Sequence, residues 1–151
     1  MKVYVAAPLF SDSERLFNAS LCAAIEGNCK VHLPQRDGPL VEREIELGAT
    51  ATTAIRLAYE SDISAIKQCD VIVAVLDGRV IDEGVCIEIG FAKALCKLVV
   101  GLKSDSRCTL PWGHNPMIDG CVDVWVKSVD ELSAWVAAKA TTNVEFSAGK
   151  R

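Results

Sequence analysis

The feature that most constrains the fold is an uninterrupted apolar run from Val71 to Leu76, near the middle of the chain. A strand that is apolar at every residue, rather than at every second one, is typical of a parallel sheet covered on both faces. Four further strand-like runs alternate with helical patterns: Val3 to Ala7, Lys30 to Leu33, Leu98 to Leu102 and Val122 to Val126. The sequence therefore predicts an α/β protein with a doubly wound, Rossmann- or flavodoxin-like, five-stranded parallel sheet and helices on both faces.

Helix signals fill the gaps between these strands, and two of them are capping boxes, Ser11-x-x-Glu14 and Ser128-x-x-Glu131. The expected spans are Ser11 to about Gly27, Thr52 to Gln68, Ile87 to Cys96 and Ser128 to about Lys139. The segment around Asp37-Gly38-Pro39 indicates a polar loop. Because no repeat or composition break marks a second domain, we expect one domain over residues 1–140 and a polar tail over residues 141–151.

Composition narrows the classes of function. The chain is 50% hydrophobic with a formal charge of -4, and its 16 lysines and arginines are scattered, which argues against a nucleic-acid partner. Seven cysteines without paired short spacing and two histidines favour packed, reduced thiols over a zinc site or disulfides. The chain begins directly with a strand and has no run long enough to span a bilayer, so we expect a cytoplasmic protein with no membrane partner.

Ligands of open α/β sheets bind beyond the carboxyl ends of the strands, and two acidic residues fall there. Asp82 lies in the turn after the run Val71 to Leu76, and Glu88 follows it in the first turns of a helix, where backbone N–H groups stabilise negative charge. An ionised carboxylate that faces a cleft is a potential nucleophile. The alternative is that Asp82 is an N-cap and that Glu88 is a solvated helical residue.

Other residues have two interpretations as well. Asp62 lies on the helix before Val71 and is either a solvated residue or a member of the same site. Phe10, Trp112 and Met117 are either core residues or, because of their proline and polar neighbours, loop residues that line a flat apolar slot for a planar ligand.

Several common motifs are absent from the sequence. No Gly-x-Gly-x-x-Gly follows the first strand, and no Gly-x4-Gly-Lys-Ser/Thr loop occurs, so two phosphate-binding signatures are missing. His32 and His114 are far apart in sequence and are interpreted as structural or edge histidines.

Taken together, these residues resemble the nucleoside 2-deoxyribosyltransferase family. The resemblance rests on five pieces in order: Tyr4 in Val3-Tyr4-Val5-Ala6-Ala7-Pro8-Leu9-Phe10, Asp62 in Ser61-Asp62-Ile63-Ser64-Ala65-Ile66-Lys67, Asp70 before an apolar strand, Asp82 six residues before Glu88 in Glu88-Ile89-Gly90-Phe91-Ala92, and Asn115-Pro116-Met117. It extends from the first strand to about Met117, which is most of the domain.

The resemblance implies a role for each matching residue. Glu88 resembles the nucleophile that forms a covalent deoxyribosyl ester, and Tyr4 resembles the tyrosine that holds and tunes it. Asp62 and Asp82 match aspartates that contact the nucleobase, one of which passes a proton to the departing ring nitrogen. Asn115 and Met117 match sugar-binding residues that reach into a neighbouring subunit's site, which implies a homo-oligomer, at least a dimer. No role is transferred to the tail from Asn143 to Arg151, which does not align.

The chemistry of an N-glycosidic bond is consistent with these roles. Cleavage develops positive charge on the sugar and negative charge on the base, so an anion beneath the ring and an acid beside the base lower the same barrier. This chemistry needs no metal and no cofactor. The resemblance implies that the substrates are a deoxyribonucleoside and a free nucleobase. It also implies the family's α/β fold and a retaining double displacement.

Two alternatives stay open. One is hydrolysis of deoxynucleoside 5'-monophosphates, for which the first loop, Ala7 to Asp12, would need an anion site. That loop is apolar and then acidic, with Arg15 as the nearest cation, which favours an unphosphorylated nucleoside, although Ser11 and Ser13 could contact a phosphate. The other is a noncatalytic nucleotide-binding domain in which Glu88 caps a helix or binds a ribose.

Overall fold

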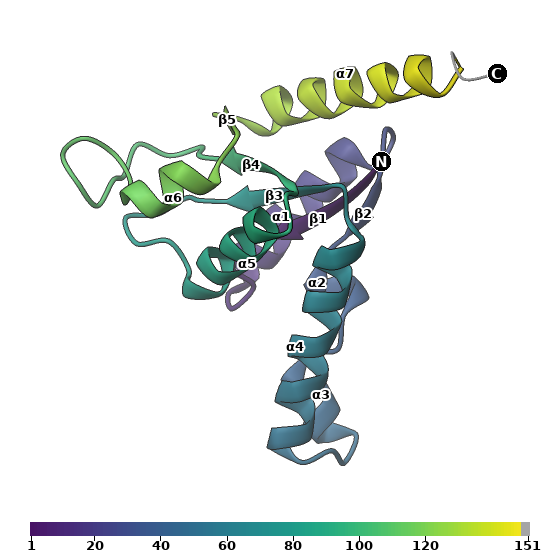
Figure 1. Cartoon of the computed structure of the whole chain (residues 1–151). Helices are drawn as coiled ribbons and strands as arrows, with labels where there is room; N and C mark the ends of the chain where they lie inside the picture. The colour runs from purple at the N-terminus through teal and green to yellow at the C-terminus, as the bar shows by residue number, and fades with distance from the viewer. Residues whose placement is uncertain (149–151) are drawn as a thin grey trace.

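The computed structural model describes residues 1–148, with side chains described as far as Thr141, and it contains one five-stranded parallel sheet (Figure 1). The strands are β1 (Lys2–Ala6), β2 (Lys30–His32), β3 (Val71–Val75), β4 (Leu98–Leu102) and β5 (Val124–Val126). Their order in the sheet is β2-β1-β3-β4-β5, and every neighbouring pair is parallel. The predicted α/β fold and the five parallel strands are confirmed.

The helices are α1 (Asp12–Ile25), α2 (Pro34–Asp37), α3 (Val41–Glu46), α4 (Ala51–Gln68), α5 (Glu83–Ala94), α6 (Pro116–Cys121) and α7 (Val129–Ala148). The capping box predicted at Ser11 is present: its hydroxyl accepts from the Glu14 N–H, and the Glu14 carboxylate accepts from the Ser11 N–H. α5 begins four residues earlier than predicted because Asp82 caps it.

Two other boundaries differ from the prediction. The segment expected to be a polar loop contains the short helices α2 and α3, which are too short to show a helical period in the sequence. α7 continues through Thr141 to Ala148 rather than ending near Lys139, because no proline or glycine interrupts those residues. Within the expected tail, residues 149–151 lie outside the described part of the chain.

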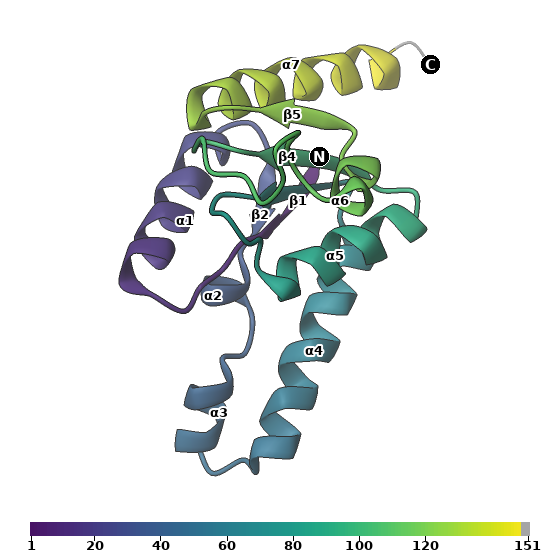
Figure 2. The ribbon, with the colours of Figure 1, turned by 90° about the vertical axis from the view of Figure 1, so that its left-hand side faces the viewer.

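The sheet lies between two layers of helices (Figure 2). The side chains of each strand alternate between these layers. Val3 and Val5 belong to the core cluster that packs against α1 and α7, together with Leu21 and Leu132. Tyr4 and the residues in phase with it belong to the other cluster, which packs against α4 and α5: Tyr4, Ala6, Ile66, Ile72, Ala74, Val85, Ile89, Ala92 and Val99. The alternation therefore directs Tyr4 toward the helices that carry Asp62 and Glu88.

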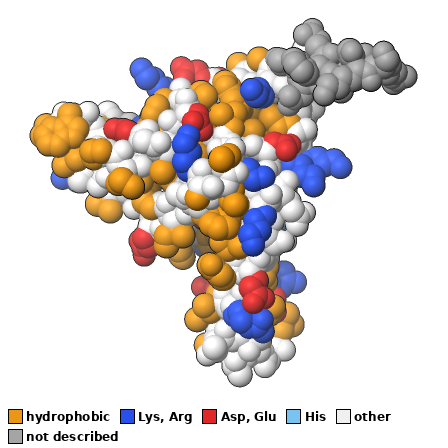
Figure 3. All heavy atoms as spheres, viewed as in Figure 1, with side chains coloured by type: hydrophobic (Ala, Val, Ile, Leu, Met, Phe, Trp, Pro, Cys, Tyr) orange, Lys and Arg blue, Asp and Glu red, His pale blue; other side chains and the backbone are white. Residues whose placement is uncertain are grey.

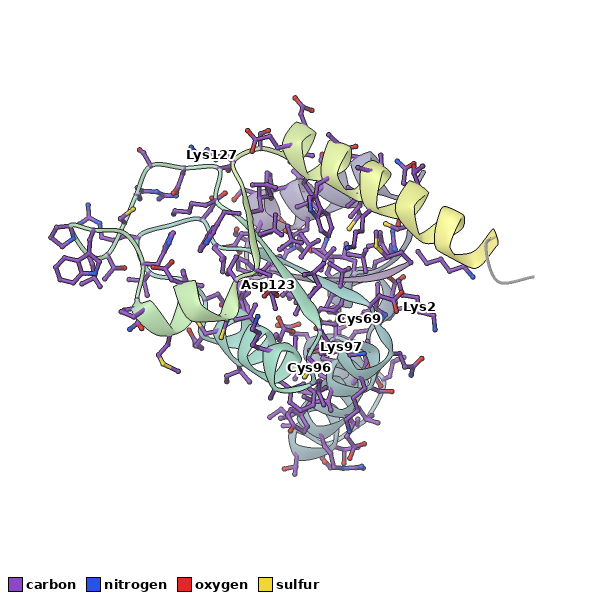
Figure 4. The ribbon with its side chains drawn as sticks, turned by 45° about the horizontal axis from the view of Figure 1, so that its top comes forward. Lys2, Cys69, Cys96, Lys97, Asp123 and Lys127 are labelled. Atoms are coloured by element: carbon purple, nitrogen blue, oxygen red, sulfur yellow. The ribbon has the colours of Figure 1, made fainter. Side chains whose placement is uncertain are left out.

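The amino and carboxyl ends of the parallel strands lie on opposite sides of the sheet, and labelled residues mark each side in Figure 4. Lys2, Cys69 and Lys97 lie at the amino-terminal edge, where the Lys97 Nζ donates to the carbonyl of Cys69 at 2.7 Å and to that of Lys67 at 2.8 Å. This ammonium binds carbonyls at the carboxyl end of α4, where it also balances the helix dipole. Lys127 marks the opposite edge, beyond the carboxyl ends of the strands, where the predicted site lies.

A helical arm projects from the body of the molecule, formed by α3 and the amino-terminal half of α4 (Figures 1 and 2). α4 contacts β1 and α5, and Ala65 and Ile66 near its carboxyl end belong to the core cluster around Tyr4. The apolar side chains on the arm, Leu47, Ile55 and Tyr59, are exposed. In the described part of the chain, no helix is both long and apolar enough to cross a bilayer.

The cysteines are less uniformly buried than the sequence predicted. Cys22 and Cys69 are buried thiols, as predicted for packed cysteines, but Cys96 and Cys108 are exposed. All seven are free thiols.

Candidate active site

The centre of the site is a hydrogen bond between two residues 84 positions apart in sequence. The Tyr4 hydroxyl, on β1, donates to Oε1 of Glu88, on α5. Tyr4 is 0% exposed, and the Glu88 side chain is partly buried. Burial and the charges of Glu88 and Asp62 raise the pKa of Tyr4 far above its usual range, so the hydroxyl stays protonated and remains a donor.

Two carboxylates near this pair share its environment. The pKa of Glu88 is raised to about 8. Burial is the largest cause, the hydrogen bond from Tyr4 lowers the pKa, and the negative charges of Asp62 and Asp82 raise it. Burial raises the pKa of Asp62, on α4, to about 6, although interaction with the polar Tyr4 hydroxyl acts in the opposite direction. The structure therefore brings Tyr4, Asp62, Asp82 and Glu88 into one electrostatically connected group.

Asp82 has a structural contact of its own. Its Oδ1 accepts from the Val85 N–H at 3.0 Å and caps α5, as one interpretation of the sequence expected. Asp82 also lines a cavity, and its negative charge raises the pKa of Glu88. Capping and a place in the site are thus combined in Asp82, whereas Glu88 is not a solvated helical residue.

His32 covers one side of Tyr4. The two rings stack with centroids 5.5 Å apart and an interplanar angle of 11°. Burial lowers the pKa of His32, which favours the neutral imidazole. A neutral ring provides no positive charge to offset the carboxylates, so their raised pKa values are retained. The histidine packs against the site as a structural residue.

Two cavities flank the carboxylate group, and Phe10 borders both. The larger, about 500 Å³, is lined by Asp82 and by residues of the first loop, α1 and the turn after β3. The smaller, about 340 Å³, is lined by Asp62, Gln35 and apolar residues of α2, α3 and α4. Glu88 itself lines neither cavity. The charges of Asp62, in one cavity lining, and of Asp82, in the other, both act on its pKa. Phe10 is 76% exposed and thus lies at the opening, not in the core.

The larger cavity has an acidic lining. Glu14, Asp77 and Asp82 line it, and Arg107 is the one cationic side chain among its described residues. Arg107 donates to Oδ2 of Asp105 through Nε at 2.6 Å and Nη2 at 2.5 Å, so its charge is already paired. An added anion would therefore meet a net negative wall.

The other predicted substrate-binding residues lie elsewhere. Met117 is 76% exposed, and Asn115 is exposed while its side chain accepts from the Met117 N–H at 2.9 Å and caps α6. Neither lines the two cavities described above. The loop before α6 projects from the body of the molecule and ends in hydrophobic side chains (Figures 1 and 3). Trp112 of this loop is exposed. Within one chain, Asn115 and Met117 do not join the carboxylate group.

Sequence reasoning missed a group of residues that support the first loop. Asn18 is 1% exposed in α1 and donates from Nδ2 to the Pro8 carbonyl and to Oε1 of Gln35, both at 2.9 Å. The signal was available, because Asn18 is a polar residue three positions before Leu21 on the apolar side of its helix. Its partners could be found only from the fold.

The fold and the site together define an α/β protein with a carboxylate centre at the ligand edge of a parallel sheet. A family model described as nucleoside 2-deoxyribosyltransferase matches residues 3–139. The chain belongs to the nucleoside 2-deoxyribosyltransferase family, whose members act on deoxynucleosides and nucleobases. It is 27% identical over 135 residues to a nucleoside deoxyribosyltransferase of Limosilactobacillus fermentum, covering 85% of this chain and 80% of the relative.

Solved structures share the fold. A conserved protein from Enterococcus faecalis V583 is 26% identical with a TM-score of 0.77, covering 92% of this chain and 98% of its own. A 2-deoxyribosyltransferase from Bacillus psychrosaccharolyticus has a TM-score of 0.72 at 18% identity, with 88% and 90% covered. A CMP N-glycosidase from Clostridium botulinum has a TM-score of 0.56 at 20% identity, with 90% and 98% covered. The fold is therefore shared by a transferase and a glycosidase.

Proposed function

We propose that the protein transfers a 2-deoxyribosyl group between nucleobases through a covalent ester on Glu88. The observation that carries this proposal is the hydrogen bond from Tyr4 to Glu88 inside a group of carboxylates at the ligand edge. A carboxylate oriented by a buried hydroxyl and partly removed from water is suited to attack an electron-poor carbon.

In the first step, a carboxylate oxygen of Glu88 bonds to the anomeric carbon of the nucleoside. The N-glycosidic bond breaks, its electron pair goes to the ring nitrogen of the base, and that nitrogen takes up a proton. Attack and departure occur on opposite faces of the sugar, so the ester has inverted configuration. The partly buried carboxylate stabilises the positive charge that develops on the sugar.

In the second step, a different base displaces Glu88. A ring nitrogen of the incoming base bonds to the anomeric carbon, the ester bond breaks, and its electrons return to the Glu88 carboxylate. The proton of the incoming nitrogen goes to the acid that served the first step. Two inversions give net retention, and transfer exceeds hydrolysis when the base occupies the cavity in place of water.

We assign the proton to Asp62 rather than to Asp82. Asp62 is the aspartate with a raised pKa, about 6, and it interacts with Tyr4. Asp82 instead uses Oδ1 to accept from the Val85 N–H. With pKa values of about 6 and about 8, Asp62 and Glu88 share one proton near neutral pH. In the reactive arrangement that proton is on Asp62 and Glu88 is ionised, so Glu88 attacks while Asp62 gives its proton to the departing ring nitrogen.

The acidic lining of the larger cavity supports an unphosphorylated nucleoside as substrate. A phosphate there would face Glu14, Asp77 and Asp82, while Arg107 is already paired with Asp105. The competing function is hydrolysis of a deoxynucleoside 5'-monophosphate. It remains a candidate because a CMP N-glycosidase has a similar fold. A noncatalytic nucleotide-binding domain is the third candidate, and it would show no turnover with any nucleoside.

The exposure of Asn115 and Met117 supports a homo-oligomer with a shared site, of at least two subunits. Both residues are displayed at the start of α6, and neither reaches the cavities of its own chain. A second subunit would give them a sugar to bind. Measurement of mass in solution by light scattering tests this, and a monomer that is fully active would contradict it.

The experiment for the function is an exchange assay. The protein is incubated with deoxyinosine and adenine, with deoxyinosine alone, and with deoxyinosine 5'-monophosphate alone, and the products are separated by chromatography. We expect deoxyadenosine from the first mixture and slow release of hypoxanthine from the second. Rapid hydrolysis of the monophosphate without exchange would favour the glycosidase, and no product from purine or pyrimidine donors would exclude both enzymes.

A further inference from the structure

The first loop is held by side chains of the helix that follows it. Asn18 donates to the Pro8 carbonyl at 2.9 Å, and the Arg15 Nη1 donates to the Leu9 carbonyl at 2.9 Å. Oε2 of Glu14 accepts from the N–H groups of Phe10 at 3.0 Å and Ser11 at 2.8 Å. Backbone groups of consecutive loop residues, which in most loops contact water, are therefore bound to α1.

A second chain of bonds connects this loop to α2. The Asn18 Nδ2 also donates to Oε1 of Gln35, and the Gln35 Nε2 donates to the Arg15 carbonyl at 2.9 Å. Both Nδ2 hydrogens of Asn18 are used, which accounts for a 1%-exposed amide in an apolar helix face. An apolar side chain at position 18 would leave the partly buried Pro8 carbonyl and Gln35 Oε1 without this donor, and one at position 35 would remove the connection from α2 to Asn18 and Arg15.

These bonds lie between the two cavities. Pro8 and Asn18 line the cavity that contains Asp82, and Arg15 and Gln35 line the one that contains Asp62. Phe10 borders both cavities and is highly exposed, although its backbone is bound. An exposed aromatic ring on a fixed backbone offers a planar ligand a stacking surface that needs little ordering on binding.

We propose that Asn18 and Gln35 are positioning residues that act on substrate through Phe10. They set the place of the Phe10 ring between the two cavities and so determine the affinity for the nucleobase. The proposal rests on the proposed function for the identity of the ligand. Neither Asn18 nor Gln35 needs to touch the base, since both amide hydrogens of Asn18 and one of Gln35 are used within the protein.

The first measurement does not depend on turnover. Amide hydrogen exchange of Phe10 and Ser11 is followed by NMR in the wild type, Gln35→Leu and Asn18→Ala. We expect roughly tenfold faster exchange in both variants, because the loop opens locally without global unfolding. Ser133→Ala is the matched control: it removes a side-chain bond from α7 to the Ala24 carbonyl of α1, away from the loop. Unchanged exchange in Gln35→Leu, or equal acceleration in Ser133→Ala, would overturn the proposal.

The second measurement is a double-mutant cycle with the exchange assay. We expect Gln35→Leu to raise the KM for adenine and deoxyinosine about fivefold with kcat within twofold, which is the pattern of lost binding. In a Phe10→Ala background the same substitution should change KM less than twofold, because its effect passes through the ring. Equal effects in both backgrounds would overturn the positioning role. An inactive wild type would instead refute the proposed function and leave the exchange result as the deciding test of the loop.

Discussion

The residues predicted for the site divide into two regions that differ in almost every physical respect. Tyr4, Asp62 and Glu88 are joined by hydrogen bonds and charge inside the molecule. Phe10 and Met117 are each 76% exposed. We call Tyr4, Asp62 and Glu88 the inner region and Phe10 and Met117 the rim. The residues of the inner region shift one another's pKa values, whereas the rim presents apolar surface to a ligand or a second subunit.

The difference indicates which steps of the reaction a single chain completes by itself. In the proposed mechanism the inner region supplies the nucleophile Glu88, the donor Tyr4 that orients it and the acid Asp62, so bond breaking would need no further residue. The rim becomes useful only when substrate or a second subunit covers it. Substitutions inside are thus expected to reduce kcat, and substitutions at the rim to raise KM.

The largest effect is expected for Glu88→Gln. The amide cannot form the ester, so exchange should fall by about 10⁴-fold or more, as for the loss of a covalent nucleophile. Binding of deoxyinosine, measured by calorimetry, should be retained. The control is Glu83→Gln, an exposed change in the first turn of the same helix. Activity within tenfold of wild type in Glu88→Gln would place the nucleophile elsewhere and remove the distinction between the regions.

The next effect separates the two aspartates. We expect Asp62→Asn to reduce exchange with deoxyinosine by about 10²- to 10³-fold, the usual contribution of a general acid. With 4-nitrophenyl 2-deoxyriboside, whose leaving group needs no proton, the loss should be less than tenfold. Asp82→Asn serves as the comparison, because asparagine also caps helices and the protein should keep its stability. An equal loss with both donors would show that Asp62 does not supply the proton.

The pH profile tests whether the inner region titrates as one group. Below about pH 6 both Asp62 and Glu88 hold protons, and above about pH 8 both are ionised, so kcat/KM should be greatest between these limits. Tyr4→Phe removes the bond that lowers the pKa of Glu88 and should reduce activity about 10- to 100-fold. Its alkaline limb should move to higher pH. A profile that is flat from pH 5 to 9 would contradict the shared titration.

The smallest kinetic effect is expected at the rim. Met117→Ala should raise the KM for deoxyinosine a few-fold with little change in kcat, as expected when apolar contact with a ligand is lost. If the residue serves a neighbouring site, inactive Glu88→Gln subunits mixed with Met117→Ala subunits should restore the wild-type KM in part of the sites. A kcat loss comparable to that of Asp62→Asn would remove the difference between rim and interior.

Stability should respond to the same chemistry with a defined sign. The folded-state pKa of Glu88, about 8, lies above the ordinary value of 4.5, so the folded protein binds the proton more tightly than the unfolded chain. This contribution is present below about pH 4.5 and is lost as the pH rises to 8. Glu88→Gln removes the cost of ionisation, so its melting temperature should exceed that of the wild type by several degrees at pH 8.5 and by little at pH 4.5. An unfolding midpoint that is lower in Glu88→Gln at both pH values would contradict the raised pKa.

The sequence placed Asp82 and Glu88 at the ligand end of the sheet because they follow the apolar run Val71 to Leu76, whereas Tyr4 and Asp62 were predicted only from the family resemblance. The structure supplies the physical reason that they meet: the alternation of β1 directs Tyr4 into the core cluster that packs against α4 and α5. The support of Phe10 could not be inferred, because the bond from Asn18 to Gln35 joins a helix face to a segment expected to be a loop. Helices of four and six residues leave no periodic signal, so α2 and α3 were not predicted.

The carboxyl end of α4 is bound to the body of the molecule, whereas its amino-terminal half belongs to the arm (Figure 1). Lys97 fixes the end of this 18-residue helix, which is about 27 Å long, and Asp62 lies six residues from that end, only about 9 Å along the axis. A rod that turns about its fixed end moves its free tip about three times as far as a point one third along it. A rotation of α4 about its held end would therefore move Asp62 only about a third as far as the tip of the arm.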